Sequence, residues 1–265
     1  MFHVDLSGKK GLIMGVANQR SLAWAIARPL AQAGARLAFS YQGDRLKPTL
    51  EKLTEDLDHP LLLEADVTDD AALDRLFDQV ASELGGLDYL VHSIAFAPSA
   101  TFERPFLQTT REDWRVAMDV SAYSLVAVAQ RAAPLMSRGG GILTLTYLAA
   151  ERVVPHYNMM GIAKAALEAS VRYLAYDLGP RGVRVNAISA GAVRTIAARS
   201  ISGFAEMYSQ AGALSMLRRN ITAEEVGAMG FALLTEELGG GVTGETVYVD
   251  AGFHAIGMFL PREEG

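Results

Sequence analysis

Short aliphatic runs alternate with longer helix-like segments along the whole chain, and this alternation limits the possible folds more than any other feature. The runs predicted as strands are KKGLIM, ARLAFSY, PLLLEAD, LDYLVHSIA, GGGILTLTY, VRVNAIS and GETVYVD. Because these runs are mostly apolar, both of their faces should be buried, as in a parallel sheet that has helices on each side. We therefore predict an α/β fold with a doubly wound parallel sheet of about seven strands.

The segments between these runs predict helices over residues 21–34, 70–85, roughly 110–136 and 157–178, with further helical segments around 200–235. Pro29 lies inside the first helix, where it removes a hydrogen bond and should kink the chain at a cost of about 3 kcal/mol if unrelieved. We find no linker, repeat or low-complexity block, so residues 1–265 are predicted to form a single domain.

Composition excludes several functional classes. A net charge of −6 argues against nucleic acid or an anionic membrane surface as partner. The chain has no cysteine, so it has no disulfide framework or thiolate chemistry, which fits a reducing cytoplasm. We see no signal peptide and no apolar stretch of the roughly 18 to 20 residues that span a bilayer. We expect a cytoplasmic protein without a resident metal.

The first strand runs into the loop GVANQRS, from Gly15 to Ser21, and then into a helix. Glycine at the end of a strand lets the backbone turn tightly. Ser21 is expected to cap the helix or to contact a phosphate, since the helix N-terminus offers free N–H groups and a partial positive charge to a pyrophosphate. The usual G-x-G-x-x-G motif is absent, so this loop alone is equally compatible with a plain strand-to-helix turn.

The ends of the next strands raise the odds of a dinucleotide site, because carboxyl ends of strands line the nucleotide crevice in a doubly wound sheet. Asp66 there is expected to accept from an adenine amino group, and Gln42 to lie near the adenosine. The alternative for Asp66 is a turn or helix-cap aspartate. The second strand has no basic residue at its tip, and Arg45 and Lys47 come slightly later, which favours NADH over NADPH.

Tyr157 and Lys164 stand seven positions apart in a segment that reads as helical. At about 100° per residue, both side chains would leave one helix face, two turns apart. A nearby lysine is expected to lower the pKa of the tyrosine, which can then donate to a carbonyl oxygen while the lysine holds ribose hydroxyls. The spacing alone favours a plainer interpretation, a half-buried aromatic and a solvated helix charge.

The segments GVANQRS, SIAFAP, LTLTYLAAERVVPHYNMMGIAKAALEASVRY, GVRVNAISAG and VRT together closely resemble the bacterial enoyl-acyl carrier protein reductases. These are a divergent branch of the short-chain dehydrogenase/reductases, with a Rossmann-like sheet, and the resemblance covers about residues 4–258. Ordinary members use Tyr-x3-Lys with an upstream serine. In this chain those two positions hold Met160 and Tyr147, and the tyrosine stands one turn earlier at Tyr157, which is the enoyl reductase pattern.

The resemblance implies NADH-dependent reduction of the trans-2 double bond of enoyl thioesters on acyl carrier protein. Tyr157 would stabilise the enolate oxygen, Lys164 would grip the nicotinamide ribose, and Tyr147 would shape the site or assist protonation. The resemblance also implies a homotetramer in which the helices of residues 110–136 and 157–178 pack between subunits. The alternatives are a carbonyl or other enone reductase of the same superfamily, and a non-catalytic NAD(H) sensor.

The resemblance further implies two sets of contacts. The cofactor would contact Gly15, Ser21, Leu22, Gln42, Asp66, Val67, Ser93, Ile94, Lys164, Val193, Arg194, Thr195, Ile196 and Ala197. The substrate would contact Ala97, Tyr147, Tyr157, Met160, Phe204 and Met207. A mobile apolar lid over the acyl chain is expected at about residues 195–215, including Ile201; the alternative there is a plain surface helix.

Overall fold

Seven parallel strands form one sheet in the computed structural model, which describes residues 4–195 and 203–258. Their order is β3-β2-β1-β4-β5-β6-β7, and every neighbouring pair is parallel. The strands are β1 (Lys10–Met14), β2 (Arg36–Tyr41), β3 (Leu61–Glu64), β4 (Tyr89–His92), β5 (Gly140–Thr146), β6 (Val183–Ala190) and β7 (Thr246–Val249). The predicted doubly wound Rossmann-like fold is confirmed.

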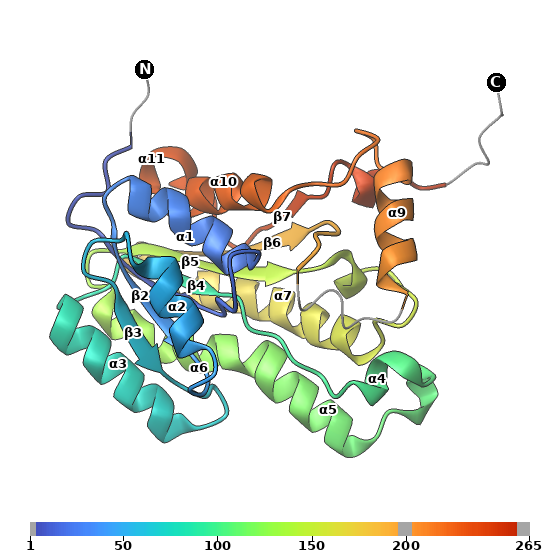
Figure 1. Cartoon of the computed structure of the whole chain (residues 1–265), viewed down its shortest axis with the longest axis horizontal. Helices are drawn as coiled ribbons and strands as arrows, with labels where there is room; N and C mark the ends of the chain where they lie inside the picture. Colours follow the sequence, from blue (N-terminus) through green and yellow to red (C-terminus); the bar gives the residue numbers. More distant parts are fainter. Residues whose placement is uncertain (1–3, 196–202, 259–265) are drawn as a thin grey trace.

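Helices cover both faces of this sheet (Figure 1). One face carries α1 (Leu22–Gln32), α2 (Lys47–Thr54), α10 (Ala223–Leu234) and α11 (Glu236–Gly239), and the other carries α3 (Asp70–Leu84), α6 (Ser124–Ala132) and α7 (Met159–Leu178). At one end of the sheet lie α4 (Ala100–Glu103), α5 (Arg111–Met118) and α9 (Phe204–Leu214). Among the described helices, none is both long and apolar enough to cross a membrane.

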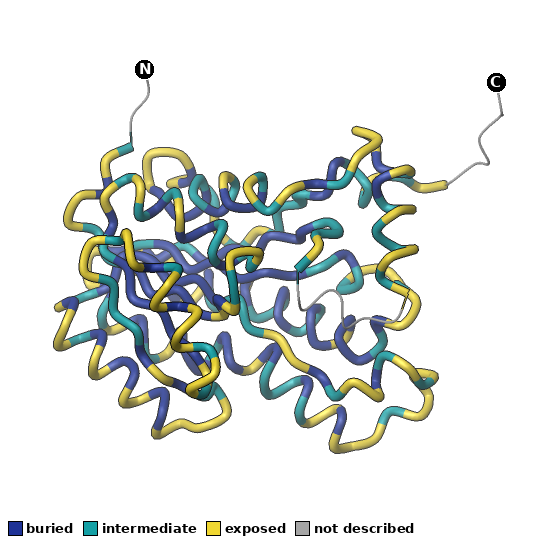
Figure 2. Tube along the Cα trace, viewed as in Figure 1, coloured by how far each residue is buried: buried dark blue, intermediate teal, exposed yellow. Residues whose placement is uncertain are grey.

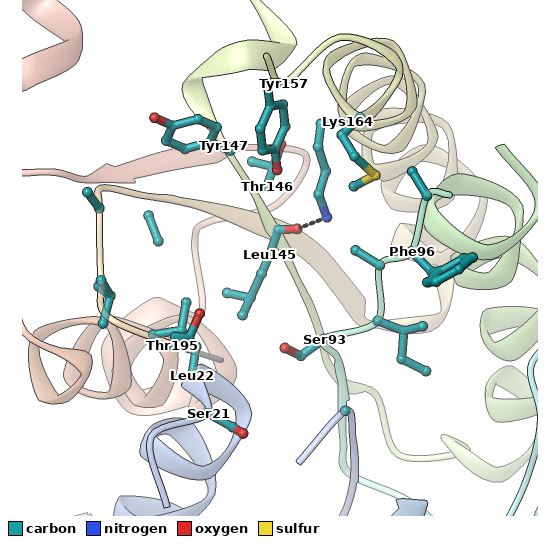
Figure 3. A pocket seen from close by; sticks show the side chains of 18 of the residues that line it. Ser21, Leu22, Ser93, Phe96, Leu145, Thr146, Tyr147, Tyr157, Lys164 and Thr195 are labelled. Atoms are coloured by element: carbon teal, nitrogen blue, oxygen red, sulfur yellow. Dashed lines mark hydrogen bonds between the residues drawn. The ribbon is translucent and has the colours of Figure 1, made fainter. Parts of the chain in front are cut away.

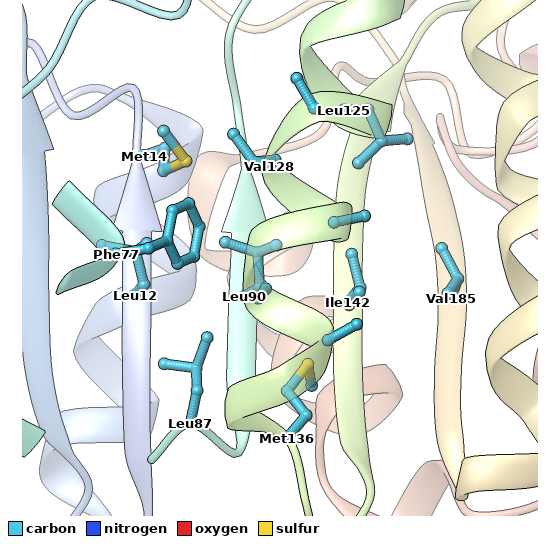
Figure 4. Close-up of a cluster of buried hydrophobic side chains, with 14 of the residues drawn as sticks. Leu12, Met14, Phe77, Leu87, Leu90, Leu125, Val128, Met136, Ile142 and Val185 are labelled. Atoms are coloured by element: carbon cyan, nitrogen blue, oxygen red, sulfur yellow. The ribbon is translucent and has the colours of Figure 1, made fainter. Parts of the chain in front are cut away.

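The core consists of two apolar layers, one on each face of the sheet. Along β1, Leu12 and Met14 enter one layer and Ile13 enters the other, as the strand period of two requires. Phe77 of α3 packs in the first layer (Figure 4), and Phe39 of β2 lies in the second. The five inner strands β2, β1, β4, β5 and β6 are therefore buried on both sides (Figure 2), which explains why their sequences are apolar without alternation.

The helical stretch predicted over residues 110–136 is composite. It begins with a capping box, in which the Thr110 side chain accepts from the backbone N–H of Asp113 and the Asp113 side chain accepts from that of Thr110. After α5 comes a π-helical turn over Asp119–Tyr123, then α6, and then a 3₁₀ turn over Ala133–Leu135. Such π-helical turns are frequent at functional sites, and this one places a serine against the candidate site described below.

Pro29 does not end helix α1, which continues to Gln32. The backbone carbonyl of Ala25, four residues before Pro29, has no N–H to accept from at that proline. This carbonyl faces Gly227 of α10, so closely that a Cβ atom built on Gly227 would lie 2.2 Å from the Ala25 oxygen. The two helices therefore pack backbone against backbone at this point.

We expect Gly227→Ala to destabilise the fold by about 1–3 kcal/mol, because the added methyl forces apart two backbones that cannot yield locally. The higher helix propensity of alanine opposes this loss by about 1 kcal/mol and does not cancel it. Thermal unfolding measures the change. Gly179→Ala is the matched control, since a Cβ there meets nothing within 4 Å. An unfolding temperature of Gly227→Ala at or above the parent value would contradict the close approach.

Candidate active site

A cavity of about 620 Å³ opens at the carboxyl ends of β1, β4, β5 and β6 (Figure 3). The sheet order reverses between β1 and β4, and this switch point is where open α/β sheets bind ligands. Many residues predicted from the sequence line this one cavity: Gly15, Ser21, Leu22, Ser93, Ile94, Ala97, Tyr147, Tyr157, Met160, Lys164, Val193, Thr195, Phe204 and Met207.

Gly15 permits the tight turn that leads from β1 into the cavity wall. Its φ is +92°, and a Cβ atom there would lie 2.0 Å from the carbonyl oxygen of Ser93. A side chain at this position would meet both backbone strain and a collision with the neighbouring strand end. The sequence therefore needs glycine here, although it has no complete G-x-G-x-x-G motif.

Ser21 is the N-cap residue of α1, but its side chain makes no capping hydrogen bond, so of the two predicted roles only the phosphate contact stays open. Its Oγ instead accepts hydrogen bonds from the backbone N–H groups of Ala17 and Asn18, at 3.0 and 3.1 Å, and closes the loop on itself. The first turn of α1 is left without a side-chain cap. Uncapped N–H groups at a helix N-terminus beside a cavity suit a bound pyrophosphate, so this part of the wall fits a dinucleotide.

Gln42, Asp66 and Val67 do not line the cavity but follow the neighbouring strands β2 and β3. Gln42 Nε2 donates to Asp66 Oδ2 at 2.8 Å, and Asp66 Oδ1 accepts from the N–H and the hydroxyl of Thr68. Burial raises the pKa of Asp66, but the bonds from Thr68 and Gln42 outweigh it and keep the pKa below its ordinary value. Asp66 therefore has the turn role that the sequence left open, and remains an ionised acceptor.

Tyr157 reaches the cavity from a turn, because α7 begins only at Met159. Asn158, the residue between them, has φ 41° and ψ −114°, which no helix accommodates. The prediction that Tyr157 and Lys164 leave one face of one helix was therefore wrong. Both side chains nevertheless meet in the cavity (Figure 3).

The Tyr157 phenol is held neutral. Burial, and next the neighbouring Tyr147, raise the pKa of Tyr157 far above its ordinary value, contrary to the expectation that Lys164 would lower it. The ring centroids of Tyr147 and Tyr157 lie 5.0 Å apart, and burial together with the Asp250 charge raises the pKa of Tyr147 as well. Both phenols are thus available at neutral pH as hydrogen-bond donors.

Lys164 is buried and its Nζ donates to the backbone carbonyl of Leu145 at 2.7 Å (Figure 3). Burial lowers the pKa of Lys164 to about 8, against the opposing charge of Glu168 one turn later in α7. Glu168 in turn accepts from the hydroxyl of Thr146 at 2.6 Å. Two adjacent residues at the end of β5 are therefore fixed to α7, and the ammonium sits between them and the cavity.

The family model described as enoyl-(acyl carrier protein) reductase matches residues 15–254, nearly the whole of the chain. The chain belongs to the enoyl-acyl carrier protein reductase family. It is 49% identical over 253 residues to the NADH-dependent enoyl-acyl carrier protein reductase 1 of Rhizobium meliloti (strain 1021), covering 96% of this chain and 93% of that protein. It is 44% identical over 254 residues to FabI of Escherichia coli (strain K12), covering 96% and 97%.

Solved structures of this reductase family share the fold. The Bacillus cereus enoyl-acyl carrier protein reductase, crystallised with NADP⁺ and indole naphthyridinone, has a TM-score of 0.93 at 46% identity and covers 97% of this chain and 100% of that chain. The reductase of Anaplasma phagocytophilum, in complex with NAD, has a TM-score of 0.92 at 46% identity and covers 97% and 98%.

Sequence reasoning missed a set of residues in this reductase. Fully buried Ser121, in the π-helical turn, both donates to the Phe96 carbonyl and accepts from the Phe96 N–H, each at 2.8 Å. It thereby fixes the loop after β4 that forms one cavity wall. A serine inside an apolar helical stretch gives no sequence signal for such a partner. The residues that line the cavity and were not predicted are Ala17, Asn18, Ala95, Phe96, Ser99, Phe102, Leu145, Thr146, Ala190, Gly191 and Ala192.

The reductase's expected lid is described only in part. Helix α9 contributes Phe204 and Met207 to the cavity lining. Arg194 is not in that lining, and its guanidinium carbon lies 4.4 Å from the ring centroid of Tyr208 on α9. The predicted contacts Ile196 and Ala197, and the lid residue Ile201, lie outside the described residues.

Proposed function

We propose that this cavity carries out NADH-dependent reduction of the trans-2 double bond of enoyl thioesters on acyl carrier protein, giving saturated acyl thioesters in fatty-acid elongation. The chain is an oxidoreductase of the enoyl reductase family. The observation that carries the proposed mechanism is the buried neutral phenol of Tyr157, which shares one cavity with Lys164 and the Gly15 loop.

NADH, held by the Gly15 loop and Lys164, would supply the hydride that adds to C3 of the acyl chain. Negative charge then builds on the thioester oxygen, two carbons from the reacting atom. The Tyr157 phenol donates to that oxygen and stabilises the enolate, because a preorganised donor in a dry site acts most strongly where charge develops. Tyr147, whose ring lies beside it, shapes the site and assists protonation at C2.

Lys164 is proposed to hold the nicotinamide ribose hydroxyls while its bond to Leu145 fixes its direction. The proposed cofactor contacts are Gly15, Ser21, Leu22, Gln42, Asp66, Val67, Ser93, Ile94, Lys164, Val193, Arg194, Thr195, Ile196 and Ala197. The proposed substrate contacts are Ala97, Tyr147, Tyr157, Met160, Phe204 and Met207. Apolar side chains dominate the second group, which suits an acyl chain.

A carbonyl reductase of the same superfamily is the second candidate. Such an enzyme needs its proton donor at the position of Met160. That side chain is buried, and its sulfur lies 3.7 Å from Ser121 Oγ. A thioether cannot donate a proton, and the donor at Tyr157 suits a charge displaced from the carbon that receives hydride.

The test is loss of absorbance at the NADH band with purified protein and crotonyl or dodecenoyl thioester. We expect rapid oxidation of NADH with an enoyl thioester and little with a ketoacyl thioester, and a repeat with NADPH sets the cofactor preference. Tight NADH binding without oxidation by any enoyl thioester would favour the sensor instead.

We expect the NADH affinity of the free protein to fall as pH rises above about 8, because burial lowers the pKa of Lys164 to about 8 and the neutral amine lacks the positive charge and one of the three N–H donors of the ammonium. At about pH 8 half of the amines are protonated and well below it nearly all are, so above pH 8 the dissociation constant for NADH should rise by at most about tenfold per pH unit. Fluorescence titration with NADH measures this.

Lys164→Met is the control for that pH dependence. It should bind NADH more weakly than the parent, with a dissociation constant that does not change from pH 7 to 9. Buried His92 does not titrate in this window, because burial and then Lys164 lower the pKa of His92 to about 3. If the dissociation constant of the Lys164→Met protein rose with pH as steeply as that of the parent, the titrating group would be one other than Lys164.

We also propose a homotetramer in which α5, α6 and α7 pack between subunits. Ile162, Tyr173 and Tyr176 are exposed and share one face of α7, and Tyr173 and Tyr176 are 76% and 82% exposed. Tyr173→Glu combined with Tyr176→Glu should reduce the mass measured by light scattering. The control Leu107→Glu, which lies outside these helices, should leave it unchanged. A tetramer that survives the double substitution would exclude this face.

We propose that residues 1–265 act as one dinucleotide-binding and catalytic domain, since the strands of one sheet and the helices packed around it together supply the described walls of the cavity. We propose the cytoplasm as its location, in agreement with the cysteine-free sequence.

A further inference from the structure

Asn158 adopts an uncommon backbone conformation directly after Tyr157. Its φ of 41° and ψ of −114° lie in a region that asparagine tolerates better than most residues but that glycine prefers. The conformation ends the turn and aims the chain into α7 at Met159. Strain of about 1–3 kcal/mol at such a position persists only where the surroundings enforce it.

The side chain of Asn158 explains what enforces this conformation. Its Nδ2 donates to two backbone carbonyls, that of Thr101 at 2.8 Å and that of Arg104 at 3.0 Å. Both carbonyls belong to α4 and its C-terminal end, where a short helix leaves its carbonyls without intrahelical partners. Both amide hydrogens of one side chain are thus used to join two segments far apart in the sequence.

The two joined segments form opposite sides of one contact at the cavity. Phe102 of α4 meets Tyr157 edge to face, with ring centroids 6.5 Å apart and an interplanar angle of 66°. Phe102 and Ser99 also line the cavity. The position of the phenol relative to the α4 wall is therefore set by a link that lies outside the cavity lining.

We propose that Asn158 is a positioning residue for the reaction: its amide fixes the Tyr157 phenol against the α4 wall. This inference rests on the proposed function. Asparagine alone combines two suitable donors with tolerance of the left-handed backbone. Aspartate would direct a carboxylate at two carbonyl oxygens, and glycine would keep the backbone but lose the link.

The experiment compares Asn158→Gly and Asn158→Asp with the parent, measuring kcat with an enoyl thioester and the dissociation constant for NADH. We expect kcat to fall about 10- to 100-fold, because displacing a catalytic group by about 1 Å costs that much. NADH affinity should stay within about twofold, since the α4 link does not include the Gly15 loop or Lys164.

His156→Gly is the matched control in the same turn. His156 also has positive φ, at 65°, but it is exposed and lies outside the α4 link. It should therefore leave kcat unchanged. Equal kcat values for His156→Gly and Asn158→Gly would overturn the proposal, as would an Asn158→Asp protein that retains full activity. A parallel loss of kcat, NADH affinity and thermal stability would reduce Asn158 to a structural role.

An optical readout keeps the inference separate from the proposed reaction. Ultraviolet difference titration, corrected with the Tyr157→Phe spectrum, follows ionisation of the Tyr157 phenol without any substrate. Burial, and then Tyr147, raise the pKa of this phenol in the parent, and in Asn158→Gly it should titrate at lower pH. An unchanged titration would overturn the positioning role. If the parent failed to reduce enoyl thioesters while the phenol of Asn158→Gly still titrated at lower pH, only the proposed function would be contradicted.

Discussion

Tyr157→Phe is expected to lower kcat about 100- to 1000-fold while leaving NADH affinity nearly unchanged, because it removes the hydroxyl that we propose stabilises the developing enolate. The ring keeps its contacts with Phe102 and Tyr147, so the cavity wall should hold its shape. Steady-state reduction of dodecenoyl thioester gives kcat, and NADH fluorescence gives the dissociation constant.

Tyr147→Phe is the natural comparison, since its phenol lies beside that of Tyr157 but is less deeply buried. We expect a smaller loss of kcat from this change. If the Tyr157→Phe enzyme kept its turnover, the enolate would have to be stabilised by another group. A non-catalytic sensor would bind NADH and signal equally well with either ring.

Gly15→Ala is expected to destabilise the protein by about 2–6 kcal/mol and to weaken NADH binding. Positive φ contributes about 1–3 kcal/mol of strain. The collision of the new methyl with the Ser93 carbonyl, 2.0 Å away, adds about 1–3 kcal/mol because neither backbone can move freely. Since domains are stable by only about 5–15 kcal/mol, thermal unfolding should show a large shift.

Gly8→Ala separates the two contributions to this loss. Gly8 also has positive φ, at +78°, but a Cβ there meets nothing within 4 Å. Its stability loss should equal the strain alone, and NADH affinity should not change, because Gly8 precedes β1 at the opposite end of the sheet. Equal losses for Gly8→Ala and Gly15→Ala would show that the close approach to Ser93 is unimportant.

The layered fold was predictable because a strand that is buried on both faces has an apolar sequence without polar alternation. The run from Lys10 to Met14 is apolar at each buried position, so it reads as an interior strand without any knowledge of its neighbours. The site was predictable where strand ends carry polar residues or glycine, as at Gly15, Ser93 and Tyr147. These positions depend on chain direction and topology, which the alternation of elements already implies.

The errors came from quantities that one stretch of sequence does not contain. Nothing in the letters around Tyr157 shows that Asn158 takes positive φ, so a turn was read as a helix. The pKa of Tyr157 depends on burial as well as on its neighbours, and here burial and then Tyr147 raise it, while the expected lowering by Lys164 is absent. Ser21 is a residue type that often caps helices, but its hydroxyl accepts instead from the backbone N–H groups of Ala17 and Asn18 in the preceding loop.

The strand order also has a consequence for biosynthesis. Strand β1 lies between β2 and β4, so both of its edges are paired only after β4 has been synthesised. The residues that line the cavity extend along the chain from Gly15 to Met207. At roughly 5–20 residues per second, a ribosome needs about 10–40 s to emit that much chain. During this interval the nascent sheet presents unpaired strand edges and uncovered apolar faces, so we expect folding in the cell to depend on chaperones that shield β4 and β5 until the later strands emerge.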